Sequence, residues 1–142
     1  MNLHKTLLVI AGPTAVGKTQ LCIELAKKWQ TDVVSADSRQ LYQELSIGTA
    51  KPTPAEMQGI RHHFIDSHSI QEVVSAGRYE RECLALLDTL FQEKDIVILT
   101  GGTGLYINAL CFGLDDIPAV DPAIREQLMA QIAAEGLLPL QT

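Results

Sequence analysis

The sequence predicts a three-layer α/β/α fold, in which a parallel β-sheet is flanked by helices. Short, nearly all-apolar runs alternate with amphipathic stretches in the order strand, helix, strand, helix, strand, helix. Strands buried on both faces of a parallel sheet carry such runs, and the alternation is typical of α/β proteins. Three polar clusters follow the predicted strands. In this fold class ligands bind beyond the carboxyl ends of the strands, so we expect the three clusters to converge on one site.

The predicted strands are short and separated by helical stretches or loops. They are residues 6–11, 32–36, 96–99 and, more briefly, 63–65. Between residues 45 and 63 the periodicity is weak, and Gly and Pro are frequent. This stretch therefore predicts a loop that contains one helical turn at 54–58.

Apolar residues at helical spacing predict the first helix, which follows a glycine-rich turn. Leu21, Leu25 and Trp29 recur every four residues, with Cys22 and Ala26 beside them. Residues four apart lie on the same face of a helix. We therefore expect this face to pack against the sheet.

The later helices are predicted from spacing and from their ends. The next one follows residues 75–77, and its expected inner face consists of Tyr79, Cys83, Leu87 and Leu90. A shorter helix runs through Leu110. Asp121 as N-cap and Pro122 at the first helical position begin the last helix, and Gly136 ends it.

Composition favours one ordinary globular domain. The 142 residues are 46% hydrophobic and 20% charged, and no stretch is long and apolar enough to span a bilayer. The net charge of −6 argues mildly against a self-sufficient nucleic-acid binder. Cys22, Cys83 and Cys111 are interpreted as buried free thiols in a reducing cytoplasm. No oligomerisation signal is present, and we expect a monomer.

The glycine-rich turn matches the phosphate-binding P-loop pattern GxxxxGK[ST] in full. It consists of Gly12, Pro13, Thr14, Ala15, Val16, Gly17, Lys18 and Thr19. Backbone N–H groups of such a loop surround phosphate oxygens, and the following helix adds the positive end of its dipole. Lys18 is expected to neutralise the terminal phosphate and the Thr19 hydroxyl to bind Mg²⁺. The alternative is an ordinary strand-to-helix turn. The pattern and its context predict a P-loop NTPase-like sheet and a ligand with a diphosphate or longer phosphate chain.

Asp37 directly follows the second predicted strand, within Asp37-Ser38-Arg39-Gln40. A carboxylate there can bind Mg²⁺ through water or accept a proton from an incoming nucleophile. The alternative is a helix N-cap at Asp37 or Ser38, a role that suits Asp and Ser and is compatible with function.

The third cluster is informative because it lacks an acid. Many P-loop NTPases end this strand with an Asp that holds Mg²⁺, but here Thr100-Gly101-Gly102-Thr103 follows. This absence weakens an ATPase-motor interpretation and shifts the carboxylate role to Asp37.

A group of histidines could be mistaken for a metal site. It comprises His62, His63, Asp66 and His68. Their spacing matches no standard zinc pattern. Solvated or hydrogen-bonded neighbours of a strand edge are the favoured interpretation.

Taken together, these clusters resemble the tRNA dimethylallyltransferases, also called tRNA isopentenyltransferases. The matching segments are GPTAVGKT at 12–19, SADSRQLY at 35–42, IGTAKP at 47–52, HHFID at 62–66, SAGRYERE at 75–82 and LTGGTGLYINAL at 99–110. The resemblance extends over nearly the whole chain, and the combination of GKT, ADSRQ-x-Y and GGTGLY is specific to this family.

The resemblance implies transfer of a dimethylallyl group from dimethylallyl diphosphate to N6 of the adenosine just 3′ of the tRNA anticodon. The P-loop then holds the diphosphate of the donor, with Lys18 as a catalytic contact. Asp37 matches the general base, and Thr103 matches a residue at the mouth of the channel where the substrates meet. Asp37, Ser38, Arg39, Gln40, Thr103 and Arg125 match positions that contact tRNA. The implied cofactor is Mg²⁺ at Thr19 and Asp37, and the implied partners are the donor and the tRNA anticodon arm, with no membrane.

Members of that family are longer than this chain, which ends after a helix, at residues 140–142. Residues 1–142 are therefore expected to be the P-loop core of a longer enzyme, without its helical tRNA-binding insertion and carboxyl-terminal part. The rival interpretations are a small P-loop kinase for a nucleoside or metabolite and a non-catalytic nucleotide-binding module. A kinase needs an arginine-rich lid over ATP, and no such segment is visible.

Overall fold

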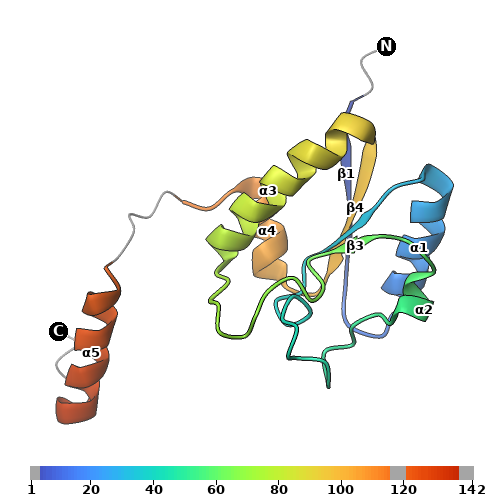
Figure 1. Cartoon of the computed structure of the whole chain (residues 1–142). Coiled ribbons are helices and arrows are strands. Elements are labelled where there is room, and N and C mark those ends of the chain that lie inside the picture. Colours follow the sequence, from blue (N-terminus) through green and yellow to red (C-terminus); the bar gives the residue numbers. More distant parts are fainter. Residues whose placement is uncertain (1–3, 116–120, 138–142) are drawn as a thin grey trace.

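A four-stranded parallel sheet in the order β1-β4-β2-β3 forms the centre of the computed structural model, which describes residues 4–115 and 121–137 (Figure 1). The expected ending at residues 140–142 lies outside these ranges. The elements are β1 (Thr6–Ala11), α1 (Lys18–Trp29), β2 (Val33–Ser35), α2 (Pro54–Met57), β3 (His62–His63), α3 (Ala76–Glu93), β4 (Ile96–Gly101), α4 (Gly104–Phe112) and α5 (Pro122–Glu135).

Helices cover both faces of the sheet, so the predicted three-layer α/β/α architecture is confirmed. Figure 1 shows α1 and α2 on one side of the strands and α3 and α4 on the other. Neighbouring residues of β2 alternate between the two layers, as the pleat of a strand requires. Val33 packs in the cluster with Cys22 of α1, whereas Val34 packs in the cluster with Tyr79 of α3.

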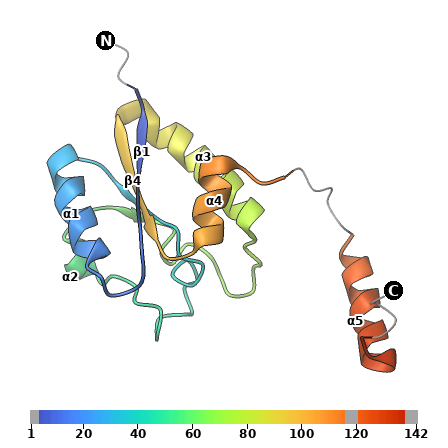
Figure 2. The same cartoon turned by 180° about the vertical axis from the view of Figure 1, so that it is seen from behind.

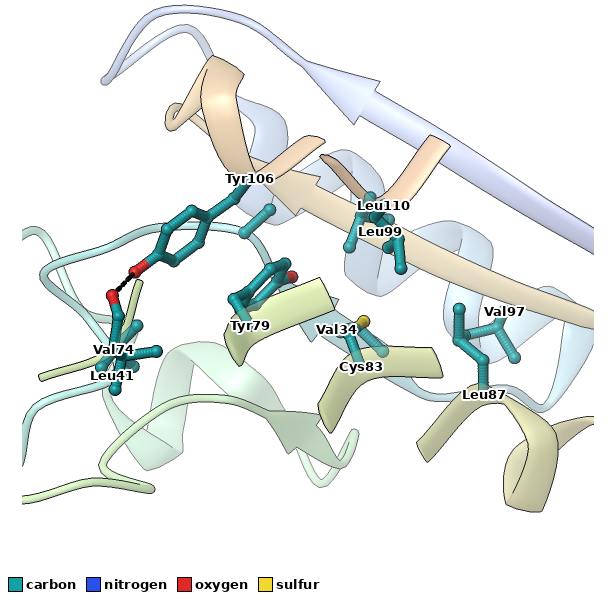
Figure 3. Close-up of a cluster of buried hydrophobic side chains, with 11 residues drawn as sticks. Val34, Leu41, Val74, Tyr79, Cys83, Leu87, Val97, Leu99, Tyr106 and Leu110 are labelled. Atoms are coloured by element: carbon teal, nitrogen blue, oxygen red, sulfur yellow. Dashed lines mark hydrogen bonds between the residues drawn. The ribbon is translucent and has the colours of Figure 1, made fainter. Parts of the chain in front are cut away.

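The larger core cluster lies between the sheet and α3 with α4 (Figure 3). Tyr79 and Tyr106 stack with ring centroids 4.3 Å apart. The Tyr79 hydroxyl donates to the Ser35 carbonyl at 2.9 Å, and the Tyr106 hydroxyl donates to the Val74 carbonyl at 2.7 Å. These bonds satisfy two buried hydroxyls, and they join α3 to the end of β2 and α4 to the segment that precedes α3.

The strands and helices follow the sequence prediction closely in most places. β1 has the predicted bounds, β4 runs two residues further, to Gly101, and α2 is the single predicted turn. A capping box begins α2: Thr53 accepts from the backbone of Glu56, and Glu56 accepts from the backbone of Thr53. Asp121 caps α5 and Pro122 is its first residue, as predicted. In α3, Tyr79, Cys83 and Leu87 are buried, and Leu90 packs at their margin.

The predicted buried face of α1 is partly wrong. The buried residues are Cys22, Ile23 and Ala26, whereas Leu21 is 46% and Trp29 36% exposed. Small side chains at 22 and 26 let the helix lie close to the sheet, so that Leu21 and Trp29 are turned towards solvent while Leu25 packs at the margin of the core.

Two further expectations are corrected. Cys111 is exposed, because it follows the inward-facing Leu110 by one helical position, about 100° around α4, near its last turn. The short edge strand is His62–His63 instead of 63–65, because Phe64 and Asp66 have φ angles of 59° and 52° and turn the chain out of the extended conformation. Cys22 and Cys83 are buried free thiols, as expected.

None of the described helices combines the length and the apolarity needed to cross a bilayer. In both views α5 lies away from the α/β body (Figures 1 and 2), and it carries no buried residue.

The packing of α3 yields a matched pair of stability predictions. Leu87 is 5% exposed and Leu84 is 45% exposed on the same helix. We expect Leu87→Ala to lower the free energy of unfolding by about 2–4 kcal/mol, because it leaves a cavity in the core. Leu84→Ala should lower it by less than about 1 kcal/mol. Urea denaturation of both variants measures the difference, and equal losses would contradict the placement of Leu87 in the core.

Candidate active site

The P-loop connects β1 to α1 and leaves the helix terminus open. Gly17 is the N-cap of α1, with a φ of 91° that favours glycine, and no side chain caps the helix there. The first N–H groups of a helix have no partner within the helix, so in the absence of a side-chain cap they can bind an anion. The Lys18 ammonium donates to the Pro13 carbonyl and thus lies across the loop. The loop therefore has the geometry of a phosphate site.

Asp37 follows β2 and has one carboxylate oxygen fixed by the backbone. Its Oδ1 accepts from the N–H of Arg39 at 2.9 Å and from the N–H of Gln40 at 3.3 Å. The alternative of a helix N-cap is wrong, because the next helix begins only at Pro54; Asp37 instead caps a turn. Within the described ranges no hydrogen bond reaches Oδ2, so this oxygen is available for a ligand or a proton.

The chain after β4 contacts the chain after β2 directly. A Cβ on Gly101 would lie only 2.3 Å from the Ala36 carbonyl oxygen, so no side chain fits at this position. Beyond this contact, the Thr103 N–H donates to the Ala36 carbonyl at 3.1 Å. The Thr103 hydroxyl accepts from the Ser38 N–H at 2.9 Å. These contacts join the second and third polar clusters.

The three polar clusters meet at one cavity of about 480 Å³, as the strand topology predicts. Its lining residues from the predicted clusters are Thr14, Ala15, Gly17, Lys18, Thr19, Asp37, Gln40, Thr100, Gly101 and Gly102. Of the other predicted site residues, Gly12, Pro13 and Val16 belong to the same loop but do not line the cavity, and Ser38, Arg39 and Thr103 are sequence neighbours of lining residues. Arg125 lies on α5, which both views place away from the α/β body.

Sequence reasoning about the residues missed the outer wall of the cavity. This wall is made of Thr49, Ala50, Lys51, Pro52, Glu56, Gln58, His62 and Ile65. The residues come from the long connection between β2 and β3, from β3 itself and, for Ile65, from the segment that follows it. One signal was available, because a connection that leaves the carboxyl end of a strand begins at the ligand-binding edge of the sheet.

The residues grouped as a possible metal site in the sequence have different hydrogen-bond partners in the structure. They are His62, His63, Asp66 and His68. His62 lines the cavity and bonds the Ile60 carbonyl through Nδ1 at 2.9 Å, and burial lowers the pKa of this imidazole. His63 bonds Asp32 at 2.8 Å, and His68 bonds Glu82 at 2.9 Å. The histidines are thus hydrogen-bonded neighbours of the strand edge. No group of three or more His, Cys, Asp or Glu within residues 4–115 and 121–137 has the arrangement of a metal site.

The fold and the cavity together define the class of protein. A strand that leads through a glycine-rich loop into an uncapped helix terminus, with a carboxylate after another parallel strand of the same sheet, is the arrangement of P-loop phosphate-binding α/β proteins.

The family follows from comparison with known proteins. A family model described as IPP transferase matches residues 40–141, and the chain belongs to this family. The tRNA dimethylallyltransferase of Cytophaga hutchinsonii is 53% identical over 135 residues, which are 95% of this chain and 44% of that protein.

Solved structures of the same family have the same fold. The full-length tRNA isopentenylpyrophosphate transferase of Bacillus halodurans aligns with a TM-score of 0.76 and 36% identity, over 96% of this chain and 45% of that one. A eukaryotic dimethylallyltransferase acting on tRNA aligns with a TM-score of 0.74 and 31% identity, over 88% of this chain and 32% of that one. The chain thus spans less than half the length of the relatives it matches.

The contact at Gly101 yields a prediction with an internal control. Gly101→Ala should lower the free energy of unfolding by about 1–3 kcal/mol, because the new methyl group collides with the backbone of Ala36. Gly104→Ala meets no atom within 4 Å at the start of α4 and should be neutral or slightly stabilising. Chemical denaturation of both variants tests the contact, which would be refuted if the two behaved alike.

Proposed function

We propose that the protein containing this chain transfers a dimethylallyl group from dimethylallyl diphosphate to N6 of the adenosine adjacent to the anticodon on its 3′ side in tRNA. The supporting observation is that the P-loop and Asp37 line one cavity in a member of the IPP transferase family. Relatives of this chain are named tRNA dimethylallyltransferase. The chain spans about 44% of their length, so the proposal concerns the whole protein.

In this proposal the P-loop binds the donor through its diphosphate. The uncapped N–H groups at the start of α1 and the Lys18 ammonium stabilise the negative charge that grows on the diphosphate as it leaves. The reaction breaks the bond between the first carbon of the dimethylallyl chain and the diphosphate oxygen. The electron pair of that bond leaves with the diphosphate, and a bond from adenine N6 to the same carbon replaces it.

Thr19 would hold Mg²⁺ directly and Asp37 would hold it through a water molecule. The oxygen donors of the cavity fit such a site. Both residues line the cavity and offer oxygen ligands. In phosphate sites Mg²⁺ is bound through one or two carboxylates together with substrate phosphates, so a larger protein ligand set is not required. When bound, the ion would supply positive charge to the leaving diphosphate.

Asp37 would accept the proton that N6 loses. An exocyclic adenine amine is a weak nucleophile, and positive charge builds on its nitrogen as the new bond forms. Asp37 Oδ1 is fixed by two backbone N–H groups, which orients the carboxylate and leaves Oδ2 for the proton. Transfer of this proton to Asp37 leaves N6 of the product without a positive charge.

The predicted tRNA contacts remain part of the proposal. They are Asp37, Ser38, Arg39, Gln40, Thr103 and Arg125. The target adenine has to leave its stack in the tRNA, because its N6 would otherwise not reach a cavity at the strand ends. Because the chain carries a net charge of −6, the rest of the protein would supply most of the basic surface for the anticodon arm. We further propose a monomer located in the cytoplasm.

The kinase alternative has no comparable support, because the comparisons do not favour it. The deciding assay gives the full-length gene product labelled dimethylallyl diphosphate, Mg²⁺ and unmodified tRNA. Label in the tRNA supports the proposal, whereas phosphate transfer from ATP to a small molecule without labelled tRNA would replace it with the kinase.

A substitution at Asp37 separates its two roles. Asp37→Asn keeps an oxygen that can accept from the Arg39 N–H but removes the base, and we expect the rate of the chemical step to fall by about a hundredfold or more. Binding of inorganic diphosphate should change little. Single-turnover kinetics and calorimetry measure the two effects, with Asp88→Asn on the exposed surface of α3 as a charge-matched control. An unchanged single-turnover rate would remove Asp37 from the mechanism.

Lys18 gives the complementary result. Lys18→Ala should weaken binding of inorganic diphosphate about tenfold or more, because charged hydrogen bonds to the anion are lost. Lys28→Ala removes the same charge from the exposed last turn of α1 and should have little effect. Calorimetric titration with inorganic diphosphate measures the affinity of each variant. Equal affinities of the two variants would mean that the P-loop is only a structural turn.

A further inference from the structure

The outer wall of the cavity is held in place by hydrogen bonds instead of apolar packing. Residues 45–52 (the wall loop) contribute four lining residues, Thr49, Ala50, Lys51 and Pro52. Thr49 is the only buried residue of the wall loop, and Ile47 at its tip is 99% exposed. A segment with so little buried apolar surface depends on its polar contacts for its position.

Gln40 supplies the contacts that join the wall loop to the sheet. Its side-chain N–H groups donate to the carbonyls of Thr49 and Ala50, each at 3.1 Å. Its side-chain oxygen accepts from the Ser35 hydroxyl at 3.1 Å. Two carbonyl neighbours can pair only with the NH₂ group of an amide, so the orientation of this side chain is determined.

The same residue is connected to the proposed base. The Gln40 N–H donates to Asp37 Oδ1 at 3.3 Å, and Ser35 is the last residue of β2. The Ser35 carbonyl in turn accepts from the buried Tyr79 hydroxyl at 2.9 Å. Gln40 therefore stands between a well-anchored strand end, the base and the wall loop.

We propose that Gln40 is a positioning residue, which sets the distance between the wall loop and Asp37 and so shapes the cavity. Both donors and the oxygen of its side chain are used within the free protein, so beside the tRNA contact proposed above Gln40 acts on tRNA through the wall loop. That effect on tRNA rests on the function proposed above. The positioning itself is a property of the free protein.

Other contacts hold the wall loop at points further from the base. The Lys51 ammonium donates to the Tyr42 carbonyl and bonds Asp66 at 2.6 Å, and its side chain is 9% exposed. The Thr49 hydroxyl donates to the Leu45 carbonyl at 3.0 Å, within the loop. Because these anchors persist when Gln40 is changed, its loss should loosen the wall loop without unfolding the domain.

Limited proteolysis of the free protein tests the positioning. Gln40→Glu is nearly isosteric but places a carboxylate oxygen against two carbonyls. We expect cleavage within residues 45–52 to become about tenfold faster or more, with the free energy of unfolding of the domain changed little. Gln92→Glu adds the same charge at an exposed position near the end of α3 and should leave the wall loop as it is.

A second substitution covers the case in which the new charge itself disturbs the fold. Gln40→Met removes the hydrogen bonds without adding charge, and it should speed cleavage of the wall loop in the same way. If Gln40→Met leaves the rate of cleavage within 45–52 equal to that of the unmodified protein, the positioning role is overturned. This holds whether or not the protein modifies tRNA, because no substrate is present.

Kinetics of the full-length gene product then distinguish positioning from a direct contact. A displaced wall changes the cavity, so Gln40→Met should lower kcat as well as kcat/KM for tRNA. Substitution of a residue whose only role is to touch tRNA would raise KM for tRNA at unchanged kcat and leave cleavage of the wall loop unaltered. That combination would refute the proposal.

Discussion

The contact between Gly101 and Ala36 is the constraint on which the rest of the site depends. Adjacent parallel strands always end at the same edge of a sheet, but their following segments need not touch. Here the backbone at Gly101 lies against the Ala36 carbonyl so closely that no side chain could be accommodated. The contact brings Thr103 to Ser38 and fixes the start of the segment that carries Asp37. Without it, the P-loop and the carboxylate would have no fixed separation.

Backbone N–H groups hold negative charge at both the diphosphate site and the base of the proposed reaction. At the P-loop they are the uncapped amides at the start of α1, and at Asp37 they are the amides of Arg39 and Gln40. Backbone groups belong to elements that the core already fixes, so they need little reorganisation when charge develops. The side chains of Lys18 and Asp37 then add charge and basicity to a framework that is already oriented.

Much of the fold could be predicted because its signals are local. The all-apolar run of β1, the turn at 54–58 and the Asp121-Pro122 start of α5 each depend on neighbouring residues, and the structure confirms them. The buried face of α1 could not be predicted in the same way. There the small residues Cys22 and Ala26 decide how closely the helix approaches the sheet, which spacing of the large apolar residues does not reveal. The end of β3 likewise depends on positive φ angles at Phe64 and Asp66 that no propensity indicates.

The part of the cavity formed by the three polar clusters (its inner half) could be predicted from the sequence, whereas the part formed by the outer wall (its outer half) could not. The reason is physical. The inner half is built at strand ends, whose relative positions follow from the topology of a parallel sheet. The outer half is built from the wall loop, which has almost no buried apolar surface and therefore no hydrophobic pattern to read. Its position is set by hydrogen bonds from one side chain to two carbonyls, a contact between residues nine and ten positions apart. In the sequence Gln40 looks like one more polar residue beside Asp37. In the structure it connects the strand end, the base and the wall, so the shape of the cavity depends on an amide that need not touch either substrate.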